Sequence, residues 1–417
     1  MKSTFTLIVL FCTYFHSFSQ TKKVLWIGNS YTAVNNLPLL TYNLALSAGD
    51  TLIYDSNTPG GMTFNGHSTN ATTLQKIALG GWDNVILQAQ SQEPSFSPGQ
   101  VASQTTPFAR MLDSLIHVSS PCAETVFYMT WGRKYGDASN CANYPPICTL
   151  SGMTDRLRSS YKLMADENEA LLAPIGMAWK KAWETDSSIN LWSSDNSHPS
   201  LAGSYLAACI FYTTLFKKNP VGLSYNAGLS GANALFLQEI AATVYFDSLE
   251  VWNANRFKPV ADFNSSSNGT LFSFSQNSQN ATQYIWDFGD GNTSQIAEPT
   301  HGYNVIESQF DVQLIVSDGC FSDTIIKTVL INPLSLNKIL ENEIGIYPNP
   351  TDGVINIKSE SLIELQYSIL DYLGRVVISN KPLLSNSINC STLNSGMYFI
   401  KFENKYSNNF IPFIKLN

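Results

Sequence analysis

The stretch Val24-Leu25-Trp26-Ile27-Gly28-Asn29-Ser30-Tyr31 decides the fold of the N-terminal part of the chain. Its first four residues form an apolar run, which is typical of a strand buried on both faces of a parallel sheet. A Gly-Asn-Ser string follows, so Ser30 lies at the carboxyl end of the predicted strand, where parallel sheets bind ligands. Gly28 permits a tight turn there and a close approach of substrate.

Four further short apolar segments share the character of the first. They are Thr51 to Tyr54, Val85 to Leu87, Thr125 to Tyr128 and Leu171 to Ala173. Amphipathic runs lie between them, at Leu37 to Ala48, Val101 to Ile116 and Met153 to Asn168. Strands that alternate with helices predict an α/β domain over residues 21–256, with a mostly parallel sheet covered on both faces.

Helical periodicity ends after residue 256. Residues 257–333 show short alternating strands, of which Thr282 to Asp287 and Phe310 to Val316 are the clearest, and predict a small β-sandwich. A linker is expected at residues 334–343. Residues 344–417 form a second all-β segment with turn signals such as Asp352-Gly353 and Ser395-Gly396.

The first twenty residues and the composition indicate export. Residues 1–20 have a positive start, a short apolar stretch and a small or polar end, which predicts a signal peptide. No later segment has the unbroken apolar length of a transmembrane helix. Only 13% of the 417 residues are charged, the net charge is −8 and no basic cluster occurs. Nucleic acid is therefore not an expected partner.

Seven cysteines occur, and Cys12 lies within the predicted signal peptide. Cys141 and Cys148 bracket a short loop, and in an oxidising compartment we expect a disulfide between them. Cys209 lies in an apolar helical run and is expected to be a buried free thiol. The pairing of the other cysteines is left open. No His or Cys spacing suggests zinc, so we expect neither a metal nor a cofactor.

A second chemical motif, Asp195-Asn196-Ser197-His198, precedes the apolar run Leu201 to Phe216. A serine hydroxyl is a weak nucleophile and needs a base that a carboxylate orients. Ser30 alone is more simply a helix cap. Histidine is scarce before residue 256, however, and Asp195 can reach the His198 imidazole across one turn. The combination predicts Ser30 as nucleophile, His198 as base and Asp195 as the orienting carboxylate.

Gly28-Asn29-Ser30 followed by Asp195-x-x-His198 resembles the SGNH (GDSL-like) hydrolase superfamily. The resemblance covers about residues 22–250 and implies a three-layer α/β/α, flavodoxin-like parallel sheet. It also implies an oxyanion hole made by the Ser30 amide, a Gly after the second strand and an Asn after the third. Gly61 matches the Gly. Glutamine replaces the Asn, and Gln92 or Gln90 is the candidate donor, since it carries the same amide group.

Four residues near these positions are candidate substrate contacts. They are Asn29, His67, Trp131 and Arg133. For His67, a hydrogen-bonded loop histidine is an equal alternative, and for Trp131 core packing is the alternative. The choice stays open at this point.

The two C-terminal segments resemble known modules. Tyr284 to Gly291, with the sequence YIWDFGDG, resembles the signature of PKD domains, in which Trp286 and Phe288 are expected in the core. Ile346 to Pro350, with Leu370 to Arg375, resembles the C-terminal sorting domain of type IX secretion. That resemblance implies the type IX machinery of Bacteroidetes as a partner and a secreted or cell-surface location.

Two hypotheses for function follow. The first is a secreted serine esterase or deacetylase that removes acyl groups, such as acetyl, from carbohydrate. The second is a non-catalytic extracellular carbohydrate-binding or adhesion protein whose SGNH-like domain has lost turnover. The Gln-for-Asn replacement favours the second hypothesis, and the presence of Ser30, Asp195 and His198 favours the first.

Overall fold

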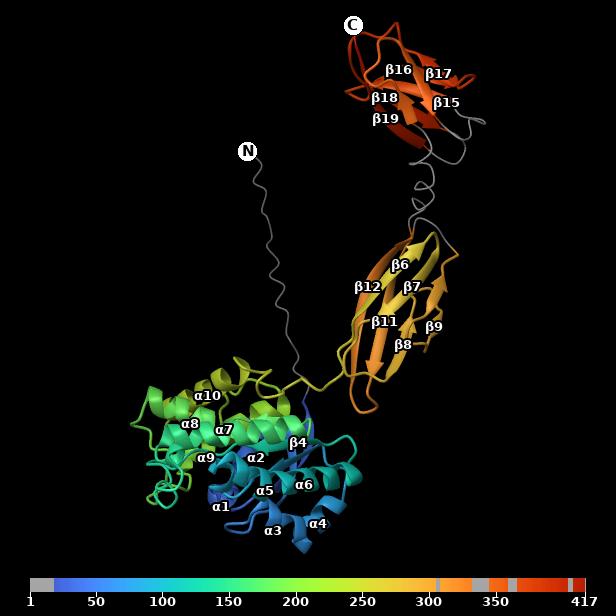
Figure 1. Ribbon diagram of the computed structural model, residues 1–417. Helices are drawn as coiled ribbons and strands as arrows, with labels where there is room; N and C mark the ends of the chain where they lie inside the picture. The colour runs from blue at the N-terminus through green and yellow to red at the C-terminus, as the bar shows by residue number, and fades with distance from the viewer. Residues whose placement is uncertain (1–18, 305–307, 332–344, 359–365, 404–407, 417) are drawn as a thin grey trace, which may run out of the picture. The chain divides into compact units, whose positions relative to one another are not determined.

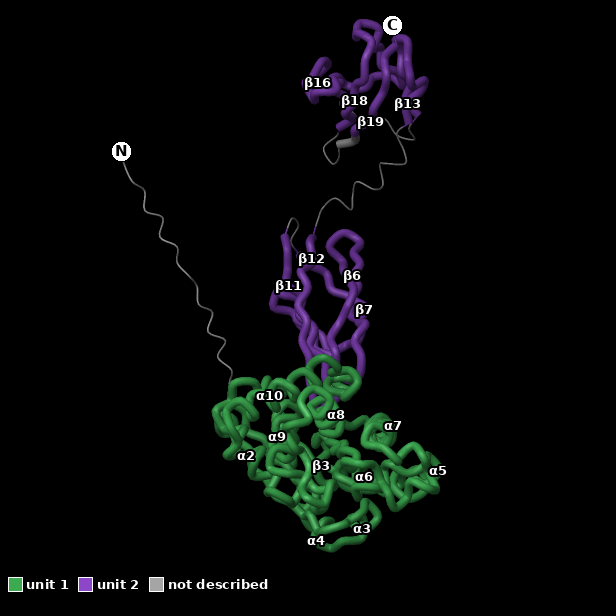
Figure 2. The backbone as a smooth tube through the Cα atoms, turned by 90° about the vertical axis from the view of Figure 1, so that its left-hand side faces the viewer, with its two compact units in different colours: residues 1–258 green, residues 259–417 purple. Residues whose placement is uncertain are grey.

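The computed structural model describes residues 19–304, 308–331, 345–358, 366–403 and 408–416. The chain divides into two compact units, residues 1–258 and 259–417 (Figure 2). The predicted signal peptide, except for its last two residues, and the predicted linker at residues 334–343 lie outside the described residues.

A five-stranded parallel sheet forms the centre of the first unit. Its strands lie in the order β2-β1-β3-β4-β5. Their bounds are β1 (Thr21–Ile27), β2 (Thr51–Asn57), β3 (Asn84–Leu87), β4 (Glu124–Tyr128) and β5 (Leu171–Ala173). This order is that of flavodoxin-like sheets, so the predicted three-layer α/β/α fold is confirmed.

The apolar strands bury both of their faces, which explains their unbroken hydrophobic runs. Along β1, Val24 and Trp26 belong to one core, whereas Leu25 and Ile27 belong to the other. All four are at most 1% exposed. Burial of each such side chain contributes about 1.5–3 kcal/mol to the stability of the fold. The two cores therefore hold β1 in the sheet and set the position of the residues that follow it.

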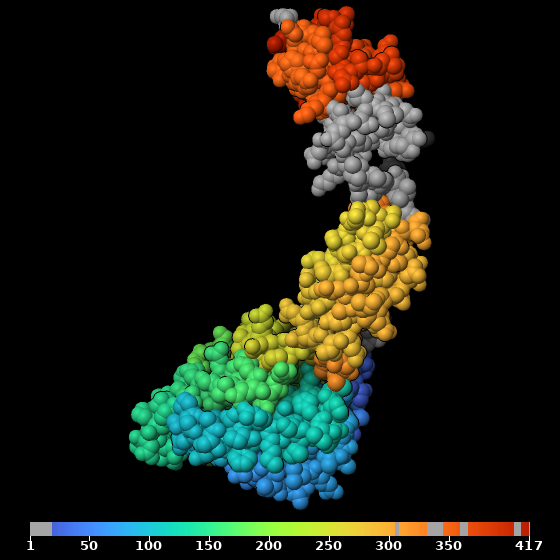
Figure 3. Space-filling model, turned by 45° about the vertical axis from the view of Figure 1, so that its right-hand side comes forward, coloured from blue at the N-terminus to red at the C-terminus, as the bar shows by residue number. Residues whose placement is uncertain are grey.

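Helices cover both faces of this sheet (Figure 1). The first core is covered by α2 (Leu37–Ser47), α8 (Ile175–Thr185), α9 (Leu201–Phe216) and α10 (Gly231–Phe246). The second is covered by α3 (Phe64–Thr69), α4 (Ala71–Ala78), α6 (Thr106–Ser119) and α7 (Leu150–Glu167). Helices α4 and α6 lie against each other, and their surface is blue and cyan in Figure 3.

One predicted helix is divided in the structure. The run Val101 to Ile116 belongs to α5 (Pro98–Gln104) and α6, and Thr105 between them has non-helical dihedral angles. Pro107 has no backbone N–H and its ring crowds the preceding turn, so a continuous helix is interrupted there. Two short elements complete the unit near the sheet edge, α1 (Ser30–Ala33) and the 3-10 turn at Glu93–Ser95.

The next module is a β-sandwich of two antiparallel sheets. One contains β6 (Phe263–Asn268), β7 (Leu271–Gln276) and β10 (Thr300–Gly302), and the other β8 (Gln283–Asp287), β9 (Thr293–Ser294), β11 (Ser308–Ser317) and β12 (Ser322–Ile331). Trp286 and Phe288 are at most 2% exposed in its core, as predicted. Asp287 and Asp290 accept backbone N–H groups of the turn between β8 and β9.

The last module is a second antiparallel sandwich. Its smaller sheet contains β13 (Gly345–Tyr347), β14 (Val354–Lys358) and β17 (Ser387–Asn389). Its larger sheet contains β15 (Gln366–Asp371), β16 (Val376–Pro382), β18 (Gly396–Glu403) and β19 (Asn408–Lys415). Branched apolar residues such as Ile355, Ile369 and Ile400 fill the space between the sheets. The prediction of two all-β sandwich modules is confirmed.

Candidate active site

A small cavity of about 220 Å³ opens at the carboxyl edge of the parallel sheet. The strand order reverses between β1 and β3 at this edge, which is where ligands of such sheets bind. The residues that line the cavity are Asn29, Ser30, Tyr31, Gly61, Gln90, Ser91, Arg133, Ser197 and His198. Almost all of them carry a polar group, so the cavity suits a polar ligand.

Three residues that are far apart in the sequence form a hydrogen-bonded chain at this cavity. The Ser30 Oγ lies 2.8 Å from His198 Nε2, and His198 Nδ1 lies 2.5 Å from Asp195 Oδ2. A carboxylate accepts only, so Nδ1 of the neutral imidazole carries the proton. Nε2 is then the acceptor, and the Ser30 hydroxyl donates to it.

Asp195 is held by the turn that it begins. Its Oδ1 accepts the backbone N–H groups of Ser197 and His198, each at 3.0 Å. Partial burial opposes ionisation, but the hydrogen bonds from the His198 ring and from these two amides lower the pKa of Asp195 below its ordinary value. The carboxylate therefore stays ionised at neutral pH beside His198.

A column of stacked aromatic rings supports the turn that carries His198. Trp131 stacks on Tyr31 with ring centroids 4.7 Å apart and on Trp179 with centroids 3.7 Å apart. The Trp131 Nε1–H donates to the Ser197 carbonyl at 3.0 Å, and the Tyr31 hydroxyl lies 2.6 Å from Ser197 Oγ. Trp131 is fully buried, so the structure contradicts its expected contact with substrate and places it in the core.

Tyr31 lines the cavity and was not among the predicted site residues. Burial raises the pKa of its phenol, which therefore stays neutral. Its ring meets the His198 ring edge to face, with centroids 5.3 Å apart. The signal that could have found it is its position next to Ser30, in the first turn of a helix at the active edge.

The Asn29 side chain connects the segments that follow β1, β2 and β3. Its side-chain oxygen accepts the Tyr31 backbone N–H and so caps α1, and its amide donates to the carbonyls of Met62 and Ala89 at 3.0 and 3.1 Å. An aspartate has no donor for these two carbonyls. Asn29 lines the cavity but is only 2% exposed, and its side-chain amide donates to the two loop carbonyls.

The Gln88 side chain occupies the space beside Gly28. Its Oε1 accepts from the Asn29 backbone N–H and from the Thr32 hydroxyl, each at 2.9 Å. A Cβ atom on Gly28 would lie 2.7 Å from this oxygen, which is too close. Gly28 therefore makes room for a buried glutamine, whereas the sequence had suggested room for substrate.

The structure distinguishes the two candidate glutamines. The Gln90 Oε1 accepts the backbone N–H groups of Gln92 and Glu93 at 2.7 and 3.2 Å, which fixes the orientation of its amide, and Gln90 lines the cavity. The Gln92 amide instead donates to Asp137 Oδ2 at 2.8 Å. Gln92 is therefore committed elsewhere. Both residues lie beyond β3, which ends at Leu87.

Two backbone amides complete the candidate oxyanion site. Ser30 is the first residue of α1, and an N–H in the first turn of a helix has no partner within the helix. Gly61 lines the cavity with a φ of +68°, a conformation that favours glycine. Nothing lies within 4 Å of the position that a Cβ atom would take there, so the backbone of Gly61 is open to a ligand.

His67 is fully buried and does not line the cavity, which contradicts its expected contact with substrate. Its Nε2 donates to the Gly28 carbonyl at 2.8 Å, so Nδ1 accepts from the Thr73 hydroxyl at 2.8 Å. Burial lowers the pKa of His67, which is therefore neutral at pH 7. The hydrogen bond from His67 to the Gly28 carbonyl stabilises the turn after β1.

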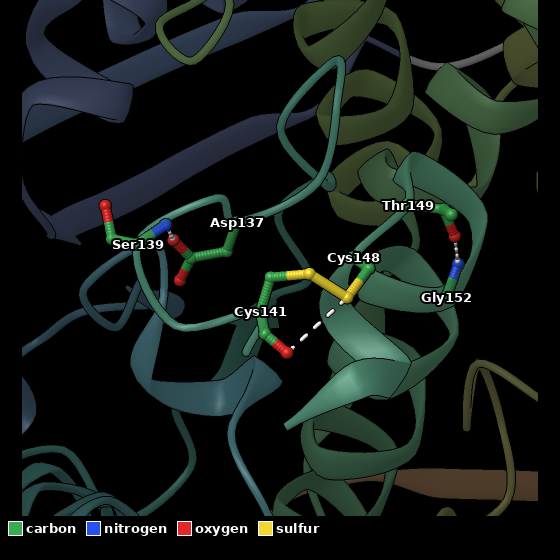
Figure 4. Close-up of a disulfide and its surroundings, with 6 residues drawn as sticks. All are labelled: Asp137, Ser139, Cys141, Cys148, Thr149 and Gly152. Carbon is green, nitrogen blue, oxygen red and sulfur yellow. Dashed lines mark hydrogen bonds between the residues drawn. A yellow bond between two sulfur atoms is a disulfide. The ribbon is translucent and has the colours of Figure 1, made fainter. Parts of the chain in front are cut away.

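Arg133 lines the cavity, as expected of a substrate contact. Its side chain is 27% exposed, and its Nη1 lies 3.4 Å from Oδ1 of Asp137, whose side chain is fully buried. Asp137 lies just before the loop that the disulfide between Cys141 and Cys148 closes, and its backbone N–H donates to the Ile147 carbonyl within that loop at 2.8 Å (Figure 4). The Cα atoms of the two cysteines are 4.8 Å apart. The disulfide therefore restrains the loop to which Asp137, the ion-pair partner of Arg133, is bonded.

Cys209 is buried and free, and so is Cys390. In the described part of the chain no group of three or more His, Cys, Asp or Glu side chains is arranged to hold a metal ion. None of the helices described combines the length and the apolar character that a bilayer span requires.

The N-terminal unit is similar to solved α/β structures. A DUF4886 family protein from Bacteroides uniformis is 19% identical, with 54% of this chain and 95% of that chain covered and a TM-score of 0.46. A candidate SGNH hydrolase from Slackia heliotrinireducens is 25% identical, with 47% and 99% covered and a TM-score of 0.40. A comparison with curated proteins found no match.

The two C-terminal modules match family profiles. Residues 258–331 match the PKD domain, and residues 345–414 match the secretion system C-terminal sorting domain. The PKD1 domain of a Vibrio cholerae metalloprotease is 34% identical, with 18% of this chain and 98% of that chain covered and a TM-score of 0.17. The chain thus carries a PKD domain and, behind it, a type IX secretion sorting domain, which directs a protein to the cell surface or the extracellular space.

Proposed function

We propose that the N-terminal unit is a serine esterase that removes short acyl groups, above all acetyl, from carbohydrate outside the cell. The observation that carries this proposal is the chain of hydrogen bonds from Ser30 Oγ to His198 Nε2 and from His198 Nδ1 to Asp195. A serine, an imidazole and a carboxylate in this order are the parts that nucleophilic acyl transfer requires.

The reaction follows from the direction of these bonds. Ser30 Oγ attacks the ester carbonyl while its proton passes to His198 Nε2, and the Asp195 carboxylate stabilises the imidazolium that forms. His198 then gives this proton to the alcohol as the acyl–oxygen bond breaks. Water, deprotonated by His198, next attacks the acyl-enzyme, and His198 gives this proton to Ser30 Oγ as the acyl–Oγ bond breaks and the acid leaves.

The negative oxygen of each tetrahedral intermediate needs donors that are in place beforehand. The backbone N–H groups of Ser30 and Gly61 and the side-chain amide of Gln90 are the donors that this proposal assigns. Gln90 suits the role because backbone N–H groups already occupy its oxygen, and its NH₂ group, which donates to Gln92 Oε1 at 3.4 Å, keeps a second N–H for the oxyanion. Glutamine therefore takes the place that asparagine has in the resembled family.

The proposed substrate class rests on the size of the cavity and on the route of export. A cavity of about 220 Å³ is below the usual range for drug-sized ligands, which favours a short acyl group over a fatty acyl chain. The sorting domain directs the chain out of the cell, where polysaccharides are accessible as substrates. A module such as the PKD domain serves as a spacer in this arrangement.

Hydrolysis of p-nitrophenyl acetate by the full chain and by Ser30→Ala tests the proposal. We expect kcat to fall by about 10⁴-fold or more in the variant, while the exposed Ser114→Ala on α6 retains wild-type activity. A fluorophosphonate probe should label the wild type and not Ser30→Ala. Equal activity of both chains would remove Ser30 from this role, and an unlabelled, inactive wild type would favour the non-catalytic binding hypothesis.

A further inference from the structure

Arg133 stands out among the residues that line the cavity. It is the only Arg or Lys among the described lining residues, and the chain as a whole carries a net charge of −8. Surface charges are screened over about 8 Å at physiological ionic strength, so an anion inside the cavity meets mainly its local surroundings. The cavity therefore presents a fixed positive charge in an otherwise acidic protein.

The ion pair with Asp137 engages only part of the Arg133 guanidinium. Asp137 already accepts from the amides of Gln92 and Asn140, each at 2.8 Å, and from the backbone N–H of Ser139 at 3.2 Å. The contact from Arg133 is the longest, at 3.4 Å, and involves one of five N–H donors. The bond from Nη1 to Asp137 is the one side-chain hydrogen bond that the guanidinium makes to the described residues, so other donors of its two Nη groups remain for a ligand.

The position of Arg133 assigns it to one half of the substrate. The segment around it is joined to the turn that carries His198, through Lys134 N–H to the Asn196 carbonyl at 3.0 Å and Trp131 Nε1–H to the Ser197 carbonyl at 3.0 Å. His198 must protonate the departing alcohol, so the alcohol lies on this side. The oxyanion donors belong to the segments after β1, β2 and β3 instead.

We infer that Arg133 binds a carboxylate on the alcohol half of the ester, so that the preferred substrates are acetylated acidic sugars such as O-acetylated uronic acids. A guanidinium pairs with a carboxylate through two parallel N–H···O bonds, which gives direction as well as charge. The 27% exposure of Arg133 leaves a path for a sugar that belongs to a polymer. This inference rests on the proposed esterase function.

The test compares acetate release from O-acetylated galacturonic acid and from its methyl ester, which lacks the negative charge and carries one additional methyl group. We expect the wild type to show a kcat/KM ratio of about tenfold or more in favour of the free acid. Arg133→Gln should bring the ratio close to one, and Arg133→Lys should retain part of it. Arg110→Gln, which removes the same charge from the exposed face of α6, should keep the wild-type ratio. The ratio cancels any general loss of activity.

A binding measurement separates this inference from the esterase proposal. Ser30→Ala should bind galacturonic acid more tightly than its methyl ester, as judged by calorimetry on the full chain, and Arg133→Gln in that background should remove the difference. A ratio near one in the wild type, or a preference that survives Arg133→Gln, overturns the inference while leaving Ser30 in place. Equal acetate release by wild type and Ser30→Ala overturns the esterase proposal alone, since binding is measured without turnover.

Discussion

The α/β unit contains the hydrogen-bonded pair Asp195–His198 and the PKD domain the pair Asp290–His301, and only the first of these lies beside a serine hydroxyl. His198 Nδ1 meets Asp195 at 2.5 Å, and His301 Nε2 meets Asp290 at 2.8 Å. The PKD pair is the more enclosed, with side chains 13% and 17% exposed, against 35% and 48% for His198 and Asp195. Neither the bond nor its burial therefore identifies a catalytic pair.

The second nitrogen of each ring is in a different setting. His198 Nε2 faces Ser30 Oγ at 2.8 Å, in a cavity with candidate oxyanion donors. The His301 ring instead stacks on Phe288 with centroids 4.1 Å apart and meets Tyr303 edge to face. The same pair thus supplies a proton acceptor in one unit and a packed turn in the other. What distinguishes the two pairs is the residue that faces the second ring nitrogen and the presence of a cavity beside it.

The largest expected effect comes from removing each imidazole in turn. We expect His198→Ala to lower kcat for p-nitrophenyl acetate by about 10⁴-fold or more, because Ser30 loses its proton acceptor. His301→Ala should leave kcat within about twofold and lower the stability of the PKD domain instead. Steady-state kinetics and scanning calorimetry on both full-length variants measure this. Comparable loss of kcat in both would end the distinction between the pairs.

Candidate oxyanion donors lie beside the Asp195–His198 pair, and variants of Gln90 and Gln92 test their role. Gln90→Ala should lower kcat by about 10²-fold or more with little change in KM, because its amide acts in the transition state. Gln92→Ala should cost less, since its amide donates to Asp137 and does not line the cavity. Kinetics of the two variants on one ester decide this, and the reverse ranking would assign the donor to Gln92.

A smaller effect is expected from the support of the His198 turn. Trp131→Phe retains ring stacking but removes the N–H that donates to the Ser197 carbonyl. One neutral hydrogen bond contributes about 1 kcal/mol, so kcat should fall by at most about tenfold. If the fold is unchanged by circular dichroism and kcat is unaffected, the aromatic column does not position His198.

The smallest effect concerns the acid stability of the PKD pair. Burial opposes ionisation of Asp290, but hydrogen bonds from the His301 ring and Asn292 lower its pKa. Such a carboxylate stabilises the fold above its unfolded pKa, near about 3.9, and the contribution is lost as the pH falls through the folded pKa. The transition of this domain should therefore be about 1–4 °C lower in Asp290→Asn at pH 6, and the difference should shrink as the pH falls below the unfolded pKa and through the folded pKa.

Much of the fold could be predicted because its signals are local. The apolar run from Val24 to Ile27 reports burial on both sheet faces, and the YIWDFGDG string from Tyr284 reports a buried Trp followed by a turn. The break at Thr105 was missed because amphipathic periodicity continues through it, although Pro107 carried the signal. At the site, Ser30, Asp195 and His198 were candidates because a serine, a histidine and a carboxylate in combination suit nucleophilic catalysis.

The roles of the neighbouring residues were not predictable, because they depend on partners distant in the sequence. Gln88 and His67 contact the turn around Gly28, at separations of 59 and 39 residues along the chain for their bonds to Asn29 and Gly28. Trp131 is buried by Tyr31 and Trp179, which no local pattern links to it. A polar or aromatic residue looks alike in sequence whether it faces a ligand or another side chain.

The sequence by itself determined the succession of an α/β unit and two β-sandwich modules, and the residue types available at the carboxyl ends of the strands. Periodicity and turn chemistry are properties of short segments, so they can be read without the fold. Only the tertiary structure decided that Gln90 faces the cavity, that Gln92 does not, and that Arg133 lies on the His198 side. Those outcomes depend on packing and hydrogen-bond satisfaction across the whole edge, where each buried polar group takes the partner that lies within its reach.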